Sequence, residues 1–311
     1  MTTPAAAAPR AAAILAKSER ENFPVASRVL PRRTRAHLLA IYGFARLVDD
    51  LGDEAPGDRL AALDWLDREV DLTYRGTPEH PLMRRLVATV RRFELPDEPF
   101  RKLIDANRQD QRVTSYPTFG ELLAYCGLSA NPVGHLVLYV LEAATPTKMK
   151  LSDAVCTGLQ LTEHWQDVKE DLGRGRVYLP QEDLARFGCG VADLRASRPS
   201  EPFRRLMRFE IERARALLDG GAPLARGLGG RPGVAVAAFV AGGWSALDAI
   251  ARAGYDVLGG SPRASRARRM LALVRTLAKV HLGRQEGVGV GHDGGSGRHA
   301  GAESRSGGGA S

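Results

Sequence analysis

Residues 160–172, QLTEHWQDVKEDL, constrain the fold of this chain more than any other stretch. Read as a helix, they place Glu163, Asp167 and Asp171 on one face, about one turn apart. Like charges at this spacing destabilise a helix by about 0.2–0.5 kcal/mol per pair. Water would offset that cost on an exposed face, but Trp165 and Val168 flank the stripe with apolar surface. The sharper prediction is a hard divalent cation such as Mg²⁺, which binds carboxylate oxygens and shares them with phosphate.

The residues that follow the acidic stripe extend this prediction. Gly173 and Gly175 should end the helix, and Arg174 and Arg176 bring positive charge beside the carboxylates. Acidic side chains, a glycine break and arginines in this order are suited to a site that holds a metal ion and a diphosphate.

A second acidic cluster ends an earlier helical pattern, in the stretch ARLVDDLGDE. Its members are Asp49, Asp50, Asp53 and Glu54, and Asp49 and Asp53 share a face. Alone, the cluster would be interpreted as a solvated helix end. Acids at a helix C-terminus nevertheless oppose the helix dipole, at a cost of about 0.3–1 kcal/mol each. Two such clusters facing each other across a bundle could hold several Mg²⁺ ions and one diphosphate.

Apolar residues recur at helical spacing along most of the chain, and no sustained alternation predicts a strand. We therefore expect an all-α fold, a single-domain helical bundle with a central apolar cavity. The helix that carries the second acidic cluster is expected to begin near Ser152, a suitable N-cap. Helices are expected at 34–52, 58–75, 81–95, 99–112, 117–126, 133–144, 152–172, 181–187, 201–219, 232–255 and 264–282. The domain should span 18–283, between a flexible N-terminus (1–17) and a disordered Gly/Ser-rich tail (284–311).

The net charge of +8 would suit anionic lipid, a phosphorylated substrate or nucleic acid. The arginines are scattered and no nucleic-acid motif is present, so we expect no nucleic-acid partner. Three cysteines without a CxxC pair predict neither a disulfide framework nor a zinc site. The N-terminus lacks the pattern of a signal peptide, and no stretch reads as a spanning helix, since 234–250 is better interpreted as buried. We expect a cytoplasmic protein, with contact at the inner face of the membrane compatible with its charge.

Several motifs resemble those of one enzyme family. DDLGD at 49–53 and QLTEHWQDVKED at 160–171 are similar to the two aspartate-rich motifs of squalene and phytoene synthases, which are head-to-head prenyl transferases. YGFARLVDD and GRGRVYLP belong to the same pattern, and the resemblance covers residues 18 to about 280. ENFPVAS at 21–27, YCGLSANPVGHLVL at 125–138 and EHWQDV at 163–168 most resemble the hydroxysqualene synthase branch of hopanoid biosynthesis.

The resemblance implies an isoprenoid-synthase fold and assigns roles to individual residues. Four aspartates would be Mg²⁺ ligands, and a glutamate would occupy a position where many relatives have asparagine. These implied ligands are Asp49, Asp53, Asp167, Asp171 and Glu163. The first four of them, with Tyr42 near the cationic intermediate, would form the catalytic set. The implied substrate-binding residues are Arg20, Asn22, Phe23, Arg46, Ala130, Val133, Gly134, Arg176 and Tyr178.

Three further positions depart from the family's pattern. Arg20 and Asn22 stand where many relatives have serines that donate to the diphosphate, and Gln166 replaces an arginine of the second motif. Arg263 could supply the missing charge, although its surroundings also suit a solvated basic face. His164 is expected to form part of the wall of the site.

The resemblance implies that the chain converts presqualene diphosphate and water to hydroxysqualene and diphosphate with Mg²⁺ as cofactor. Two alternatives remain open. The first is condensation of two farnesyl or geranylgeranyl diphosphates to presqualene diphosphate, squalene or phytoene. The second is a non-catalytic helical protein that binds acidic lipids or a partner. The expected partners are the isoprenoid diphosphate and neighbouring enzymes of the same pathway.

Overall fold

The computed structural model describes residues 29–263, 272–273 and 276, and within these residues the chain is helical with no strand. The nearest approach to a sheet is an isolated bridge between Ser115 and Val177. The elements are α4 (Arg32–Asp49), the π-helical turn η1 (Asp50–Glu54), α5 (Arg59–Arg75), α6 (Pro81–Phe93), α7 (Glu98–Asp110), α8 (Phe119–Ser129), α9 (Asn131–Val140), α10 (Pro146–Gln166), α11 (Val168–Gly173), α12 (Gln181–Arg186), α13 (Val191–Leu194), α14 (Glu201–Gly221), α15 (Pro223–Leu228) and α16 (Gly230–Arg252). The prediction of an all-α fold is confirmed.

Local sequence explains most of the helix ends. Asp58 caps α5, with its side chain accepting from Ala61 N, and Gly76 ends the helix in the left-handed conformation. Thr118 and Glu121 form a capping box at the start of α8. Such caps satisfy the backbone groups that a helix end leaves unpaired, which is why the sequence placed these boundaries well.

Three predictions about helix boundaries were wrong. Ser152 does not cap the helix of the second acidic cluster, because α10 already begins at Pro146 behind a Thr145 cap and Ser152 is buried inside it. The stretch 160–172 is not one uninterrupted helix, since α10 ends at Gln166 and Asp167 leaves helical geometry (φ −103°, ψ 17°) before α11. The helical region expected at 232–255 begins earlier, at Pro223, and consists of two helices, α15 and α16. The helix expected at 264–282 and both expected termini lie largely or wholly outside the described residues.

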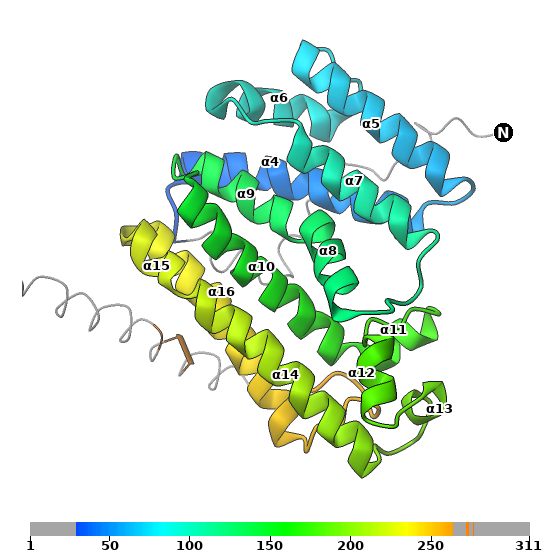
Figure 1. Cartoon of the computed structure of the whole chain (residues 1–311). Helices are drawn as coiled ribbons and strands as arrows, with labels where there is room; N and C mark the ends of the chain where they lie inside the picture. Colours follow the sequence, from blue (N-terminus) through cyan, green and yellow to red (C-terminus); the bar gives the residue numbers. More distant parts are fainter. Residues whose placement is uncertain (1–28, 264–271, 274–275, 277–311) are drawn as a thin grey trace, which may run out of the picture.

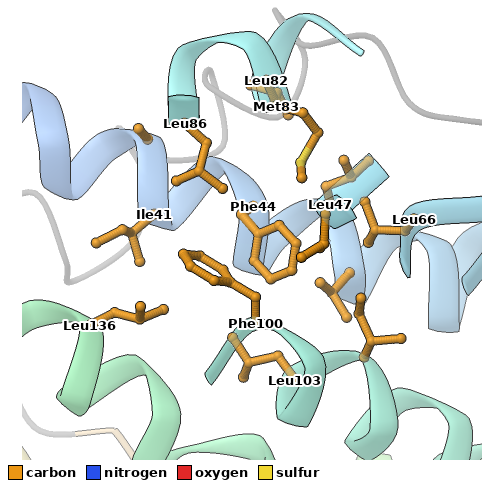
Figure 2. Packing of buried hydrophobic residues seen from close by; sticks show 14 of the residues in the cluster. Ile41, Phe44, Leu47, Leu66, Leu82, Met83, Leu86, Phe100, Leu103 and Leu136 are labelled. Atoms are coloured by element: carbon orange, nitrogen blue, oxygen red, sulfur yellow. The ribbon is translucent and has the colours of Figure 1, made fainter. Parts of the chain in front are cut away.

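Two hydrophobic cores fill the bundle. The first lies among α4, α5, α6, α7 and α9, and Figure 2 shows the edge-to-face pair Phe44 and Phe100 at its centre, with ring centroids 4.9 Å apart. The second lies among α8, α10, α11, α12, α13, α14 and α16, and Trp165 is buried in it. α9 and α10 run side by side between the two cores (Figure 1).

α15 and α16 approach each other so closely that only glycine fits at one position. A Cβ on Gly233 would lie 2.3 Å from the backbone oxygen of Ala225, whereas one on Gly242 of the same helix would meet nothing within 4 Å. Of the described helices, α16 alone has the length and composition of a membrane span, with a mean hydropathy of 1.7 over its most apolar window. Half of that window is buried, and α16 packs against α10, α14 and α15, as expected of a core helix.

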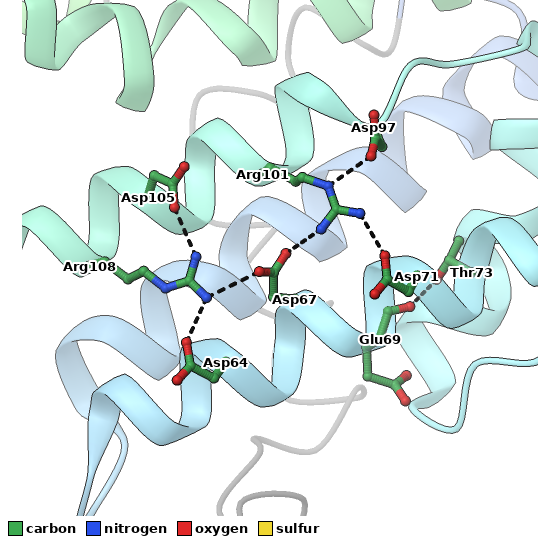
Figure 3. Close-up of polar contacts among 9 residues, drawn as sticks. All are labelled: Asp64, Asp67, Glu69, Asp71, Thr73, Asp97, Arg101, Asp105 and Arg108. Carbon is green, nitrogen blue, oxygen red and sulfur yellow. Dashed lines mark hydrogen bonds and ion pairs between the residues drawn. The ribbon is translucent and has the colours of Figure 1, made fainter.

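A network of ion pairs joins α5 to α7 on the outer surface (Figure 3). Arg101 contacts Asp67, Asp71 and Asp97 at 2.6–2.8 Å. Arg108 extends the network through the shared Asp67. Because each guanidinium lies between several carboxylates, the network ties the two helices together more firmly than isolated surface pairs would.

Candidate active site

The first acidic cluster lies where α4 widens into the turn η1. Asp49 is the last residue of α4, and Asp53 lies in η1. Single π-helical turns of this kind are frequent at functional sites. Here the turn fits closely against α7, because a Cβ on Gly52 would lie 2.0 Å from Asn107 Oδ1, and Gln111 Nε2 donates to Gly52 O at 2.9 Å. α7 thus fixes the direction in which the cluster points.

Arg46 lies one turn before this cluster, as the sequence predicts. Its Nε is 3.3 Å from Asp50 Oδ1, and its Nη1 is 4.0 Å from Asp49 Oδ2. Asp50 is buried whereas the Asp49 side chain is 52% exposed. Arg46 therefore stabilises the buried carboxylate and leaves Asp49 accessible to a ligand.

The second acidic cluster spans the break between α10 and α11. Asp167 N donates to Glu163 O at 2.9 Å and Asp171 N donates to Asp167 O at 2.8 Å, so the four-residue spacing survives the break. Glu163 is exposed, and Asp167 and Asp171 are half-buried. Ser261 Oγ donates to Asp167 Oδ1 at 2.6 Å. A segment far along the chain therefore helps to orient the central carboxylate.

Arg176 brings the two clusters together. Its Nη2 donates to Asp53 Oδ1 at 2.9 Å, across 123 residues of sequence. The charge of the same guanidinium opposes the rise that desolvation causes in the pKa of Asp171, so Arg176 lies close to carboxylates of both motifs. The two motifs thus meet at one place, on the facing sides of the two cores.

Burial of the carboxylates leaves them short of positive charge. Desolvation raises the pKa of Asp49 to about 6, with the charge of Arg46 opposing the shift. Desolvation, followed by repulsion from Asp167, raises the pKa of Asp171 to about 7. A cation placed between the clusters would stabilise both ionised carboxylates.

An aromatic cluster forms the wall beside Arg176. His164 stacks on Tyr178 with ring centroids 3.6 Å apart, and Tyr178 also packs on Tyr116 and Tyr125 at 6.0 Å. Burial lowers the pKa of His164 to about 3, so the imidazole is neutral, 4.0 Å from Asp171. These rings give an apolar wall directly beside the charged groups.

Sequence reasoning missed Asp110, the last residue of α7. Tyr125 Oη donates to Asp110 Oδ2 at 2.8 Å, while the buried Oδ1 has no hydrogen-bond partner among the described residues. Burial raises the pKa of Asp110 to about 6, and both Arg176 and Asp53 influence it. A lone acid in the polar stretch NRQDQ gives no periodic signal, so only the fold reveals that it faces the site.

The remaining predicted site residues are the catalytic candidate Tyr42 and the other substrate-binding candidates. Tyr42 is half-buried on α4, one turn before Arg46. Ala130 and Val133 lie at the start of α9, where Val133 packs against the first core. Gly134 faces α10, because a Cβ there would lie 2.3 Å from Ser152 Oγ, so helix packing already explains its small size. The expected contacts of Arg20, Asn22 and Phe23 lie outside the described residues.

The described acids fit a magnesium site of one particular kind. No three Asp, Glu, His or Cys side chains of the described chain are close enough together to hold a metal ion unaided. Mg²⁺ is usually bound by one or two carboxylates, with phosphate oxygens and water completing the shell. The pairs Asp49/Asp53 and Asp167/Asp171 supply hard oxygen donors in that number, so the donor set fits Mg²⁺ bound together with a diphosphate.

Two hollows lie near these groups. A small one, of about 10 Å³, is lined by His164, Asp171, Arg176 and Tyr178 among others. A larger open one, of about 610 Å³, lies on the outer side of η1 and the loop 55–58. Neither is the expected central apolar cavity, which stays a prediction.

Comparison with known proteins points to a single family. The family model for squalene/phytoene synthase matches residues 16–270. A phytoene synthase of Arthrospira platensis is 36% identical over 210 residues, covering 63% of this chain and 68% of that protein. A hydroxysqualene synthase of Sinorhizobium fredii is 36% identical over 208 residues, covering 66% and 70%. The crystal structure of squalene synthase HpnC from Alicyclobacillus acidocaldarius superposes with a TM-score of 0.75 at 43% identity, covering 78% of this chain and 92% of that one.

Proposed function

The chain belongs to the squalene/phytoene synthase family, and on that premise we propose that it converts presqualene diphosphate and water to hydroxysqualene and diphosphate. The observation that carries the proposal is the Arg176–Asp53 contact, which joins the two acidic motifs beside an apolar aromatic wall. The 43% identity to a squalene synthase of known structure and the hydroxysqualene synthase relative support the same branch.

The diphosphate would lie between the two acidic clusters. Bound Mg²⁺, held by Asp49 and Asp53 on one side and by Asp167 and Asp171 on the other, would neutralise charge on the leaving diphosphate. Glu163, at the exposed start of the second cluster, would assist. Arg176, whose guanidinium already reaches carboxylates of both motifs, would donate to the diphosphate oxygens and orient them.

The apolar wall would receive the carbon skeleton. Once the carbon–oxygen bond breaks, positive charge develops on carbon, and aromatic faces stabilise such charge. Tyr178 is part of this wall, and Tyr42, half-buried on α4 one turn before Arg46, would add a second aromatic face. The neutral His164 packed on Tyr178 would accept a hydrogen bond from the attacking water and orient it, and the proton released on capture would pass to the departing diphosphate.

The direct test supplies purified protein with presqualene diphosphate and Mg²⁺ and no reductant, and identifies products by gas chromatography and mass spectrometry. Hydroxysqualene and released diphosphate are expected, and chelation of Mg²⁺ should stop both. Asp53→Asn and Asp171→Asn should each reduce turnover by about 10²-fold or more, because each removes charge that acts on the leaving group. Asp219→Asn, on an exposed face of α14, is the matched control and should keep full activity.

Head-to-head condensation is the second candidate, and the 36% identity to a phytoene synthase is the observation that favours it. Incubation with farnesyl diphosphate alone and with geranylgeranyl diphosphate alone separates the two reactions. Consumption of either one, with no turnover of presqualene diphosphate, would replace the first proposal by the second. A non-catalytic protein would turn over none of the three substrates.

We also propose a cytoplasmic protein that works beside enzymes that supply its diphosphate substrate and consume its product. Hydroxysqualene is almost insoluble in water, so a membrane or a partner enzyme must receive it.

A further inference from the structure

The outer face of α6 carries four arginines and no acidic side chain. Arg84, Arg85, Arg91 and Arg92 are exposed, with Ala88 between them, while the opposite side of the helix is buried in the first core. A solvated helix face usually mixes both signs of charge, which provides attractive pairs along the helix. α6 has no such pairs, so its outward face is a strip of positive charge.

The N-terminus of α4 continues this strip. His37 Nδ1 lies 3.0 Å from Thr89 Oγ1 and its ring is 4.9 Å from Phe93, so the first turns of α4 lie against the last turn of α6. Arg32 and Arg33, both exposed, begin α4. We call these six residues the arginine face: Arg32, Arg33, Arg84, Arg85, Arg91 and Arg92.

Within the described chain, the exposed Glu79 and Glu94 flank α6 at its two ends, but neither forms an ion pair with these arginines. Among the six arginines, Arg92 is the one with an acidic partner in the described chain, Glu142 at 3.1 Å. The side chains of Arg92 and Glu142 are each more than 60% exposed. α4 has no acidic residue in its first turn and no side-chain cap, so Arg32 and Arg33 lie at the positive end of a helix dipole. Positive charge at that end is unfavourable. A protein surface with this uncompensated positive charge is suited to binding a negatively charged surface.

Exposed apolar side chains border the same face. Among the described residues, the large exposed hydrophobic side chains are Val29 and Tyr74, near this face, and Val191, on the distant α13. Val29 precedes α4 by three positions, and Tyr74 lies in the last turn of α5, where its hydroxyl donates to Leu95 O just beyond α6. Arginine and tyrosine together suit the headgroup region of a bilayer, because each has an apolar body and a polar end.

We propose that the arginine face docks the protein on a bilayer of anionic lipid. Guanidinium groups bind phosphate oxygens in pairs, and each basic residue near an anionic surface strengthens binding about fivefold (about 1 kcal/mol). From Arg32 of this face to Asp49, α4 spans 18 residues, about 27 Å, whereas α6 packs beside the middle of α4, where Leu82 lies against Gly43. The link to a lipid product rests on the proposed function, but the binding itself does not.

The test measures co-sedimentation of the full-length protein with vesicles in the absence of substrate. One set of vesicles is phosphatidylcholine alone, and the other contains about one third phosphatidylglycerol. The variant Arg84→Glu/Arg85→Glu/Arg91→Glu changes three exposed arginines of α6. Its matched control, Arg195→Glu/Arg198→Glu/Arg205→Glu, changes the net charge equally around α13 and the start of α14, at the opposite end of the molecule (Figure 1). Circular dichroism checks that both variants fold.

We expect the unchanged protein to bind anionic vesicles at least tenfold more tightly than neutral ones. The α6 variant should lose at least tenfold of that affinity, whereas the control should lose less than threefold. Equal losses in both variants would overturn the proposal, since only net charge would matter. Equal binding to both kinds of vesicle would overturn it too, as would α6-dependent binding of a short RNA duplex without vesicle binding. Turnover of presqualene diphosphate in detergent should be the same for the α6 variant, so failure of the enzyme assignment is seen separately.

Discussion

Substitution of Glu210 by glutamine should remove a large pH dependence from the stability of the protein. Glu210 lies on α14, is fully buried, and has its nearest described cation, Arg213 Nη1, 3.6 Å away. That guanidinium contacts Asp183 more closely, at 2.6 Å. Burial, together with repulsion from Asp183, raises the pKa of Glu210 to about 8.

The sign and size of the effect follow from proton linkage. The pKa of an unfolded glutamate is about 4.5. Between that value and about 8 the folded protein keeps the Glu210 proton that the unfolded chain has lost, so the free energy of unfolding falls as pH rises. The slope is about 1.4 kcal/mol per pH unit. From pH 5.5 to 8.5 the loss should reach about 3 kcal/mol, and it should level off above pH 8.

Glu210→Gln keeps the shape of the protonated side chain and cannot ionise. Urea unfolding followed by circular dichroism at pH 5.5, 7 and 8.5 should therefore show the variant gaining about 3 kcal/mol over the unchanged protein across the range. Glu212→Gln, at an exposed position of the same helix, is the matched control and should change by less than about 0.5 kcal/mol at each pH. Parallel stability curves for Glu210→Gln and the unchanged protein would refute the reasoning.

Three further predictions concern the site and the bundle. Arg176→Gln should lower turnover of the diphosphate substrate by about 10²-fold with the helical content unchanged, and Arg176→Lys should restore part of it; full activity in Arg176→Gln would remove the residue from the site. Gly233→Ala should lower the free energy of unfolding, measured in urea, by about 2–3 kcal/mol, because the new Cβ would meet the backbone of α15. The control Gly242→Ala should be neutral or stabilising. Similar values for both variants would contradict the close contact. Arg101→Gln should lower the free energy of unfolding by about 1–2 kcal/mol at low salt and by less at 1 M salt, because salt screens the ion pairs. The control Arg68→Gln, exposed on α5, should leave stability unchanged at both salt concentrations. A loss of the same size at both concentrations in Arg101→Gln would mean that packing and not charge is responsible.

Local signals predicted much of the fold. Helices such as α5 and α14 were found with nearly their observed bounds, because an apolar stripe and turn residues at the ends are properties of a short window. Ser152 misled because a good capping residue can also lie inside a helix, where its hydroxyl meets a neighbouring helix. The turn η1 could not be predicted, since its extra residue is accommodated by contacts with Asn107 and Gln111 of α7.

The sequence predicted the two acidic clusters of the site, but not the contacts that join them. Charge spacing identified both acidic clusters, and the resemblance implied that they face each other. Asp110 and the partnership of Arg176 with Asp53 depend on where distant elements pack, which no local pattern records. The roles assigned to the predicted ligands stay predictions, as does the cofactor.

The two halves of the site are mounted on different cores, and this has a consequence for biogenesis. The first core is built from residues before 141, so it can condense while the ribosome is still making the segment that carries Arg176. Asp53 is therefore synthesised 123 residues before Arg176, its hydrogen-bond partner. A diphosphate bound between the two acidic clusters would hold the two halves of the finished enzyme together and stabilise it against thermal unfolding. It could not stabilise a nascent chain that still lacks the second half.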